Sequence, residues 1–230
     1  MADRELWTVA LGRMPYAEAL ELQRAIARDR ITGMIPHDVL LLVEHDPVVT
    51  LGRSGKRGNL VASREQLEAR GVAIHDVERG GDITFHGPGQ LVGYPIVDLK
   101  RHKQDLHWYL RALESVLIES LAAHSISGEA SSGFTGVWTN GRKIASIGVH
   151  ARDWVTWHGF ALNVTTDLSF FELIVPCGIS GVNMTSMSRE LGAAAPEMDE
   201  VSGTIASRFA KAFALEIFPM PRADLVGSMS

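Results

Sequence analysis

Short apolar runs alternate with longer stripes of spaced apolar residues along this chain. Residues 39–45 begin with consecutive apolar side chains, the pattern of a strand buried on both faces of a sheet. Other runs lie between turn residues and have the length and composition of strands. The segments predicted as strands are 6–11, 39–45, 48–52, 72–77, 91–99, 137–139, 142–149 and 154–164.

Three longer segments have apolar residues spaced by three or four positions, which gives a helix one buried face. The first begins at Pro15, a residue suited to the first helical turn, and its stripe runs from Tyr16 to Ile26. Asp105 is expected to cap the second and longest helix, and the third begins at about Asp199. Shorter helices are predicted at 64–70 and 168–173.

Asn140 and Gly141 lie between two strand-like runs and form the strongest hairpin signal, because both tolerate the positive φ angles of a two-residue turn. Hairpins beside long helices, without a regular alternation of strand and helix, predict an α/β (α+β) fold with helices packed on a mixed β-sheet. Pro95 predicts an edge or a bulge in its strand. Loops are expected at 52–59 and 128–133, and a loose tail after Pro219.

The composition predicts a single domain over residues 1–230, with its core at about 5–218. Hydrophobic residues make up 46% of the chain and charged residues 21%, which is enough apolar material for a sizeable core. No run reaches the roughly 18 apolar residues of a membrane-spanning helix, and the charged start resembles no signal peptide. The lone cysteine favours a reducing, cytoplasmic location.

The net charge of −5 argues against a general affinity for nucleic acid, which needs concentrated lysine and arginine. Residues 100–103, Lys-Arg-His-Lys, nevertheless form a local basic run. Such a run is usually a solvated surface loop. It could alternatively dock an acidic protein partner, because complementary charge speeds association.

Cys177 is the only cysteine and lies between Pro176 and Gly178. A lone cysteine is most often an inert side chain of a hydrophobic core. Proline and glycine instead favour a bend, since strands and helices avoid them, and a bend would leave the thiol on a loop. The pattern alone leaves both interpretations open, and the second makes Cys177 a candidate nucleophile.

Lys143 follows the predicted hairpin turn, and a solvated strand lysine is its ordinary interpretation. Alternation along the strand places Lys143, Ala145 and Ile147 on one face. Alanine and isoleucine are unusual neighbours for a lysine on a wet face. If that face is interior, the amine becomes a competent base that can set the ionisation of a thiol.

Residues 79–90, RGGDITFHGPGQ, place glycines on both sides of a short strand. They form either a pair of turns or the backbone-lined wall of a cleft, where missing side chains leave room for a ligand. Neither the dinucleotide-binding nor the phosphate-loop pattern is present. His86 could be a partner of the thiol, although each histidine here is more often structural. Histidine and cysteine spacings predict no metal site.

Four motifs occur in one order: residues 79–95, residues 141–148, HGFALN at 158–163, and Pro176-Cys177-Gly178-Ile179. Together they resemble the motifs of the octanoyl-acyl-carrier-protein:protein octanoyltransferases of lipoate biosynthesis. Four ordered motifs over roughly residues 40–190 are far more specific than any one of them. The resemblance implies a single catalytic domain with the fold of the biotin and lipoate protein ligases.

By this resemblance Cys177 matches the nucleophile that forms an acyl thioester, and Lys143 matches the residue that activates it. The family often has tyrosine or tryptophan where this chain has Phe85, so any polar role of that ring is absent. The residues that match substrate-binding segments are Arg79, Gly80, Gly81, Asp82, Ile83, Thr84, Phe85, His86, Ser146, Ile147, Gly148, Gly159, Phe160 and Ala161.

The implied reaction moves an octanoyl group from octanoyl-acyl carrier protein to the target lysine of a lipoyl domain, the first step of endogenous protein lipoylation. Implied partners are acyl carrier protein, the lipoyl domains of 2-oxoacid dehydrogenases and the glycine-cleavage H protein, without nucleic acid or membrane. No bound cofactor is expected, because the acyl group arrives on the carrier's phosphopantetheine arm.

Three other interpretations remain open. A lipoate or biotin ligase would share the fold but would activate its acid with ATP and need no cysteine. A thiol hydrolase would use Cys177 with His86 or His158 and release free octanoate. A non-catalytic acyl-binding module would hold octanoyl groups without any covalent adduct.

Overall fold

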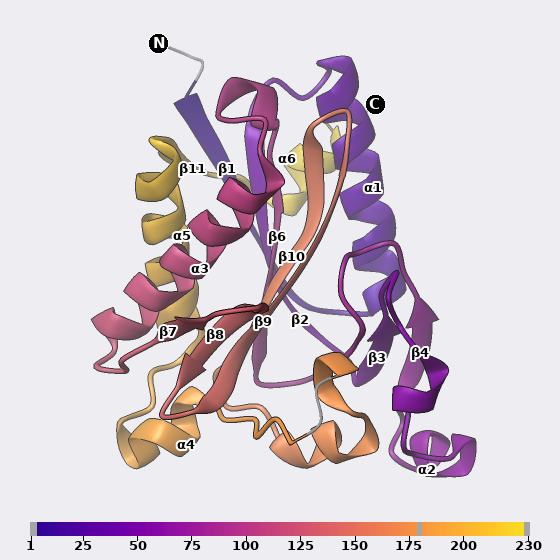
Figure 1. The fold of residues 1–230 in the computed structure, drawn as a ribbon. Coiled ribbons are helices and arrows are strands. Elements are labelled where there is room, and N and C mark those ends of the chain that lie inside the picture. Colours follow the sequence, from indigo (N-terminus) through magenta and orange to yellow (C-terminus); the bar gives the residue numbers. More distant parts are fainter. Residues whose placement is uncertain (1–3, 179–180, 228–230) are drawn as a thin grey trace.

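A computed structural model describes residues 4–178 and 181–227 (Figure 1). The strands are β1 Glu5–Met14, β2 Asp38–His45, β3 Val48–Leu51, β4 Ala73–Asp76, β5 Ile83–His86, β6 Gln90–Ile96, β7 Glu129–Ser131, β8 Phe134–Thr139, β9 Arg142–Arg152, β10 Val155–Asn163 and β11 Glu216–Pro219. A large sheet has the strand order β11-β1-β2-β6-β10-β9-β8-β7, and a small sheet the order β4-β3-β5. The large sheet is mixed, because β1 pairs in parallel with β2 and β11 while β6 is antiparallel to β2 and β10.

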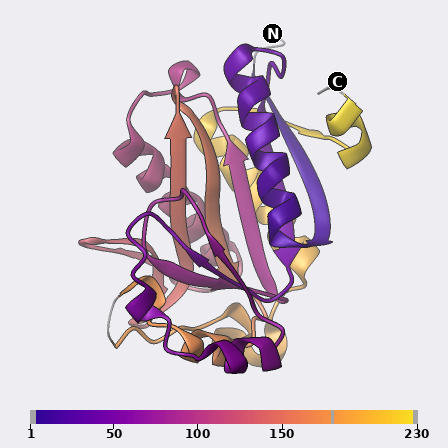
Figure 2. The same cartoon turned by 90° about the vertical axis from the view of Figure 1, so that its right-hand side faces the viewer.

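Helices cover both faces of the large sheet. The α-helices are α1 Tyr16–Thr32, α2 Arg64–Ala69, α3 Leu106–Ala123, α4 Met187–Leu191, α5 Met198–Phe213 and α6 Arg222–Gly227, and the short 3-10 helices are η2 Arg57–Asn59, η3 Leu99–Arg101, η4 Leu168–Leu173, η5 Pro176–Gly178 and η6 Gly192–Ala194. Figure 1 shows α3 and α5 together on one side of the sheet and α1 on the other, and Figure 2 views the α1 side directly.

Three apolar clusters fill the spaces between these layers. Side chains of α3 and α5 pack on one face of the large sheet, and those of α1 on the other. A third cluster lies beneath the small sheet and includes Leu67 of α2 and Phe171 of η4. The apolar stripes of α1, α3 and α5 are therefore buried against the faces of the large sheet, as the spacing of apolar residues predicted.

The local signals for the main elements are confirmed. Helix α1 begins directly after Pro15 and ends at Gly33, which has a φ of 82°, the left-handed conformation common at helix ends. The Asp105 side chain accepts a hydrogen bond from the Trp108 amide and so caps α3. Asn140 and Gly141, with φ of 48° and 72°, form the turn between β8 and β9.

Two expectations of irregular chain were wrong. Residues 129–131, expected in a loop, form β7 and pair with β8 at the end of the large sheet. The segment after Pro219, expected to be a loose tail, contains α6, whose Leu225 is fully buried in the α1-side cluster. Leu225 supplies an apolar anchor that composition alone did not single out.

Pro95 lies in β6 between β2 and β10, so of the two predicted possibilities, an edge or a bulge, the edge is excluded. Regular pairing of β6 with β10 stops at Gly93 and Phe160. His158 then has a positive φ of 56°, which breaks the ladder opposite the proline. The missing N–H of Pro95 is therefore tolerated at an irregularity inside the sheet.

Among the helices of the described residues, none is both long enough and apolar enough to span a membrane.

Candidate active site

Lys143 lies on β9 directly after the hairpin turn, and one of the two residues predicted to share its face does not. The pairing of β9 with β8 shifts register by one residue between Lys143 and Ala145, and such a bulge reverses the alternation of side chains. Ala145 therefore packs in the cluster beneath α3, whereas Lys143, Ser146 and Ile147 all line the cavity described below. The predicted grouping of Lys143 with Ala145 was wrong.

The side chain of Lys143 is 1% exposed. Its ammonium donates a hydrogen bond to the Thr135 carbonyl oxygen at 3.3 Å and lies 4.8 Å from the centre of the Trp138 ring. Gly136 makes room for it, because a Cβ at that position would lie 2.8 Å from Lys143 Cε. Gly136 was missed in the sequence, although a glycine inside a strand signals such a close approach.

Cys177 lies in the turn η5 with φ 57° and ψ 16°, a left-handed conformation that costs a non-glycine residue roughly 1–2 kcal/mol. The loop is held by polar contacts. The Val175 amide donates to the Asn59 carbonyl at 2.7 Å, and the Asn59 side chain donates to Asp82 at 2.7 Å. The thiol is partly exposed, so the loop interpretation is confirmed. Ile179 of the predicted motif lies outside the described residues.

The fold brings the two groups together, with 3.1 Å between Lys143 Nζ and Cys177 Sγ. An ammonium at this distance stabilises a thiolate by charge attraction and by a hydrogen bond. A neutral amine in the same place can take a proton from a group that attacks at the sulfur. The arrangement can therefore work as a nucleophile and its proton partner.

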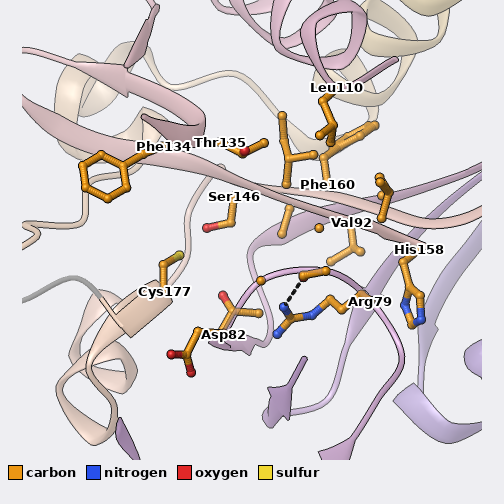
Figure 3. A pocket seen from close by; sticks show the side chains of 18 of the residues that line it. Arg79, Asp82, Val92, Leu110, Phe134, Thr135, Ser146, His158, Phe160 and Cys177 are labelled. Atoms are coloured by element: carbon orange, nitrogen blue, oxygen red, sulfur yellow. Dashed lines mark hydrogen bonds between the residues drawn. The ribbon is translucent and has the colours of Figure 1, made fainter. Parts of the chain in front are cut away.

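A cavity of about 470 Å³ opens beside this pair. In the view of Figure 3, Cys177 lies at one end and His158 at the other, with Val92 and Phe160 between them. The predicted substrate-binding residues that line the cavity are Arg79, Gly80, Gly81, Asp82, Ile83, Thr84, His86, Ser146, Ile147, Gly148, Gly159, Phe160 and Ala161.

Phe85 is the one predicted substrate-binding residue that does not line the cavity. It is 1% exposed and stacks on Phe170 with 4.7 Å between ring centres, inside the cluster beneath the small sheet. Alternation along β5 explains its position, because its neighbours Thr84 and His86 point to the cavity side.

Other walls of the cavity were missed in the sequence. Leu106 and Leu110 belong to the predicted stripe of α3 and were expected in the core. Leu106 is instead 39% exposed, whereas Leu113, further along the helix, is fully buried. The apolar stripe of α3 therefore lines the cavity near the start of the helix and packs in the core further along. The remaining lining residues outside the predicted set are Tyr16, Val92, Tyr94, His107, Gly133, Phe134, Thr135, Val149 and His158.

Arg79 fixes the glycine-rich wall of the cavity. It is 8% exposed, and its Nη2 donates to the carbonyl and hydroxyl oxygens of Thr50 at 2.8 and 2.9 Å. Burial lowers the pKa of its guanidinium from the ordinary value, although arginine keeps its charge near neutral pH. The adjacent Gly80 amide donates to the Val149 carbonyl at 2.8 Å, which joins this wall to β9.

The rings of Tyr16 and His86 form another part of the lining, and the buried His45 lies behind them. His86 stacks on Tyr16 with 5.8 Å between ring centres and lies 6.0 Å from His45. Burial lowers the pKa of His45 to about 4 and that of His86 to about 3, and raises the pKa of Tyr16 to about 12. All three rings are therefore neutral near pH 7.

Neither histidine proposed for a hydrolase is hydrogen-bonded to the sulfur, whose partner is Lys143. His86 Nδ1 is hydrogen-bonded to Gln90 Oε1 at 2.8 Å. His158 Nε2 lies 3.7 Å from Glu78 Oε1, at the far end of the cavity from Cys177 in Figure 3. Burial lowers the pKa of His158. The geometry therefore favours Lys143 over a histidine as the partner of the thiol.

The basic run at 100–103 has local partners. Lys100 Nζ lies 3.9 Å from Asp98, and Lys103 Nζ lies 3.2 Å from Asp105. Arg101 donates to the Pro36 carbonyl at 2.6 Å. Part of the positive charge is thus engaged within the chain, and docking of an acidic partner at this run stays a prediction.

Comparison with known proteins agrees with this geometry. A family model described as the lipoyl protein ligase A/B catalytic domain matches residues 15–210. An octanoyltransferase from Solibacter usitatus is 50% identical over 209 residues, covering 91% of this chain and 93% of that protein. An octanoyltransferase from Rubrobacter xylanophilus is 52% identical over 198 residues, covering 84% and 88%.

The fold also matches a solved structure. A bi-partite lipoate protein ligase from Thermoplasma acidophilum superposes with a TM-score of 0.77 at 15% identity, over 98% of this chain and 90% of that one. Likeness at this identity concerns the fold alone. It confirms the predicted mixed α/β architecture of the lipoate ligase type.

Proposed function

The chain belongs to the lipoyl protein ligase A/B catalytic-domain family, and we propose that it transfers octanoyl groups through a thioester on Cys177. Octanoyl transfer in lipoate biosynthesis is the activity of this acyltransferase, given curated octanoyltransferases that are 50% and 52% identical to it. The observation that carries the covalent route is the 3.1 Å contact between Lys143 Nζ and Cys177 Sγ beside the cavity.

In the first half-reaction the Cys177 thiolate attacks the carbonyl carbon of an octanoyl thioester on the phosphopantetheine arm of acyl carrier protein. The bond from that carbon to the carrier sulfur breaks as the bond to Cys177 forms. The departing carrier thiolate takes a proton from the Lys143 ammonium. One thioester replaces another, so the step needs no ATP.

In the second half-reaction the amine of a target lysine attacks the Cys177 thioester. Neutral Lys143 takes the proton that this amine loses as the amide forms, and Cys177 leaves as a thiolate. The thiolate–ammonium pair is thereby restored. Formation of an amide from a thioester is downhill and drives the cycle, and no bound cofactor takes part.

The cavity offers a place for the acyl chain. Ser146 pairs with Ala161 and Gly148 with Gly159 across β9 and β10, so small side chains border the space beyond the sulfur. Transfer of seven alkyl carbons from water into such a space contributes about 5–6 kcal/mol at roughly 0.8 kcal/mol for each carbon. This energy favours binding of an apolar acyl chain.

The partners belong to the same proposal. The donor is octanoyl-acyl carrier protein, and the acceptors are the lipoyl domains of 2-oxoacid dehydrogenases and the glycine-cleavage H protein. The reaction takes place in the cytoplasm, where a reducing environment keeps the single thiol free.

Intact-protein mass spectrometry tests the covalent route. Incubation with octanoyl-acyl carrier protein and no ATP is expected to add one octanoyl mass to the wild type and none to Cys177→Ser. Addition of a lipoyl domain should then clear the adduct and place the octanoyl group on that domain.

Each rival function gives a different result in this experiment. An active Cys177→Ser variant that requires ATP would indicate a ligase. Free octanoate released without an acceptor would indicate a hydrolase. Absence of any adduct on the wild type would remove the thioester mechanism.

A further inference from the structure

Glu114 of α3 is a buried acid that the reaction above does not use. It is 2% exposed. One carboxylate oxygen accepts a hydrogen bond from the Gly136 amide at 3.1 Å. The other accepts one from the Arg111 guanidinium at 2.5 Å, and the Arg111 side chain is 60% exposed. A buried carboxylate is costly unless such bonds are made, so its partners indicate what it holds in place.

The N–H that reaches Glu114 belongs to the same peptide group as the carbonyl that receives Lys143. The Lys143 ammonium donates to the Thr135 oxygen at 3.3 Å, and Thr135 is labelled beside the cavity in Figure 3. A peptide group is planar, so fixing its N–H also fixes the direction of its carbonyl. Glu114 thereby acts on Lys143 through the peptide between Thr135 and Gly136.

Gly136 has an unusual backbone conformation and lies close to Lys143. Gly136 has a φ of 139°, a conformation available essentially to glycine alone. A Cβ there would lie 3.2 Å from Lys143 Nζ and 2.6 Å from the Ala145 carbonyl oxygen. Gly136 is paired with Ser146 of β9, and the Glu114 carboxylate adds a second contact that fixes its N–H.

We propose that Glu114 is a positioning residue, which anchors the 135–136 peptide so that the Lys143 ammonium stays 3.1 Å from Cys177. This inference rests on the proposed roles of Lys143 and Cys177. The carboxylate acts through its reach to the Gly136 N–H rather than through its charge.

Loss of the Glu114 charge and loss of the Glu114 anchor should change the reactivity of Cys177 in opposite directions. A negative charge near a thiol disfavours the thiolate, so loss of the Glu114 charge alone would make Cys177 more reactive. Loss of the anchor displaces the ammonium and makes Cys177 less reactive. Glu114→Gln keeps an acceptor of the same reach without the charge, and Glu114→Asp keeps the charge with a shorter reach.

Alkylation of Cys177 by iodoacetamide across pH 5 to 10 tests the proposal without any acyl substrate, and the chain has no other cysteine. Glu114→Asp is expected to slow alkylation at pH 7 about tenfold and to move the midpoint of the pH profile upward, the size of effect that a lost hydrogen bond to a charged group allows. Glu114→Gln should stay within about threefold of wild type. Glu119→Ala, on the same helix with a 49% exposed side chain, serves as the control and should be unchanged.

The reverse order, with Glu114→Gln slower than Glu114→Asp, would overturn the proposal, because the carboxylate charge rather than its reach would then hold the peptide. Wild-type pH profiles in both variants would overturn it as well, whatever their melting temperatures, because helix packing alone leaves the sulfur unaffected. Alkylation also separates this inference from the proposed function. A wild type that forms no octanoyl adduct while Glu114→Asp still slows alkylation would reject the function and keep the positioning role.

Discussion

The amine and the sulfur of this site are held in place by different means. Lys143 lies in β9 of the large sheet and is 1% exposed. Its side chain lies against the Trp138 ring and Gly136. Cys177 lies on the short turn η5, is partly exposed, and is held through polar contacts that run from Val175 to Asn59 and Asp82. The core fixes one partner and hydrogen bonds fix the other.

This difference fits the roles that we propose for the two groups. A sulfur that accepts an acyl group from one protein and gives it to another must be open to large partners. The amine only has to reach the sulfur. Burial of the ammonium costs free energy, and a thiolate at 3.1 Å offsets part of that cost. Substitutions on the two sides should therefore differ in how they affect activity and stability.

Lys143→Met should have the largest effect, because it removes the proton partner and keeps an unbranched apolar side chain. We expect the rate of octanoyl transfer to fall about 10³-fold, within the 10²–10⁴ range of general acid–base catalysis. The melting temperature should stay equal or rise, since a buried charge is removed. Single-turnover formation of octanoyl-Cys177 and a thermal melt measure the two effects.

Lys211→Met is the matched control for this variant. Its side chain is 68% exposed and pairs with Glu119 on the surface, so neither rate nor melting temperature should change by much. A Lys143→Met enzyme within tenfold of wild type would show that the buried amine is not the proton partner.

Two buried histidines, one from the large sheet and one from the small sheet, lead to the second prediction, which concerns stability. His45 of β2 in the large sheet lies 6.0 Å from His86 of β5 in the small sheet. Burial lowers their pKa values to about 4 and about 3. Both histidines bind a proton at about pH 6.5 in the unfolded chain but only at much lower pH in the folded chain. The free energy of unfolding therefore falls as the pH falls below about 6.5.

We expect the free energy of unfolding to keep the whole contribution of these neutral histidines above pH 6.5 and to fall as the pH drops towards 4. His45 alone accounts for about 3 kcal/mol of that loss at 1.36 kcal/mol for each pKa unit. Urea unfolding at pH 7, 6, 5 and 4.5 measures the slope, and His45→Gln should make it shallower. A wild-type stability that is flat between pH 7 and 5 would contradict the assignment of both rings as buried and neutral.

Sequence reasoning predicted the parts of this site that depend on local chemistry. Asn140 and Gly141 located the hairpin, and Pro176 and Gly178 located the bend at Cys177. Each of these signals comes from adjacent residues, because turn residues determine their own φ angles. The single-domain expectation stays a prediction.

The parts that sequence reasoning missed depend on contacts between distant segments. The bulge between Lys143 and Ala145 arises from the register with β8, which no pattern within β9 reveals. The Phe85 ring stacks on Phe170, 85 positions later, although alternation along β5 was a local signal for the side on which it lies. The 3.1 Å contact itself joins two segments that are brought together only by the whole fold.

Asp82→Ala should have the smallest of these effects, and it tests the polar side of the comparison. Asp82 accepts from the Asn59 side chain at 2.7 Å and from the Lys56 amide at 3.1 Å, so its loss frees the loop that carries Cys177. We expect kcat to fall about tenfold with little change in KM, since a typical hydrogen bond to a charged group contributes roughly 1.5–3 kcal/mol. Glu68→Ala, an exposed acid of α2 paired with Arg64, is the control and should match wild type. If Asp82→Ala keeps full kcat, the polar contacts do not position the sulfur, and the turn η5 must hold its left-handed backbone without them.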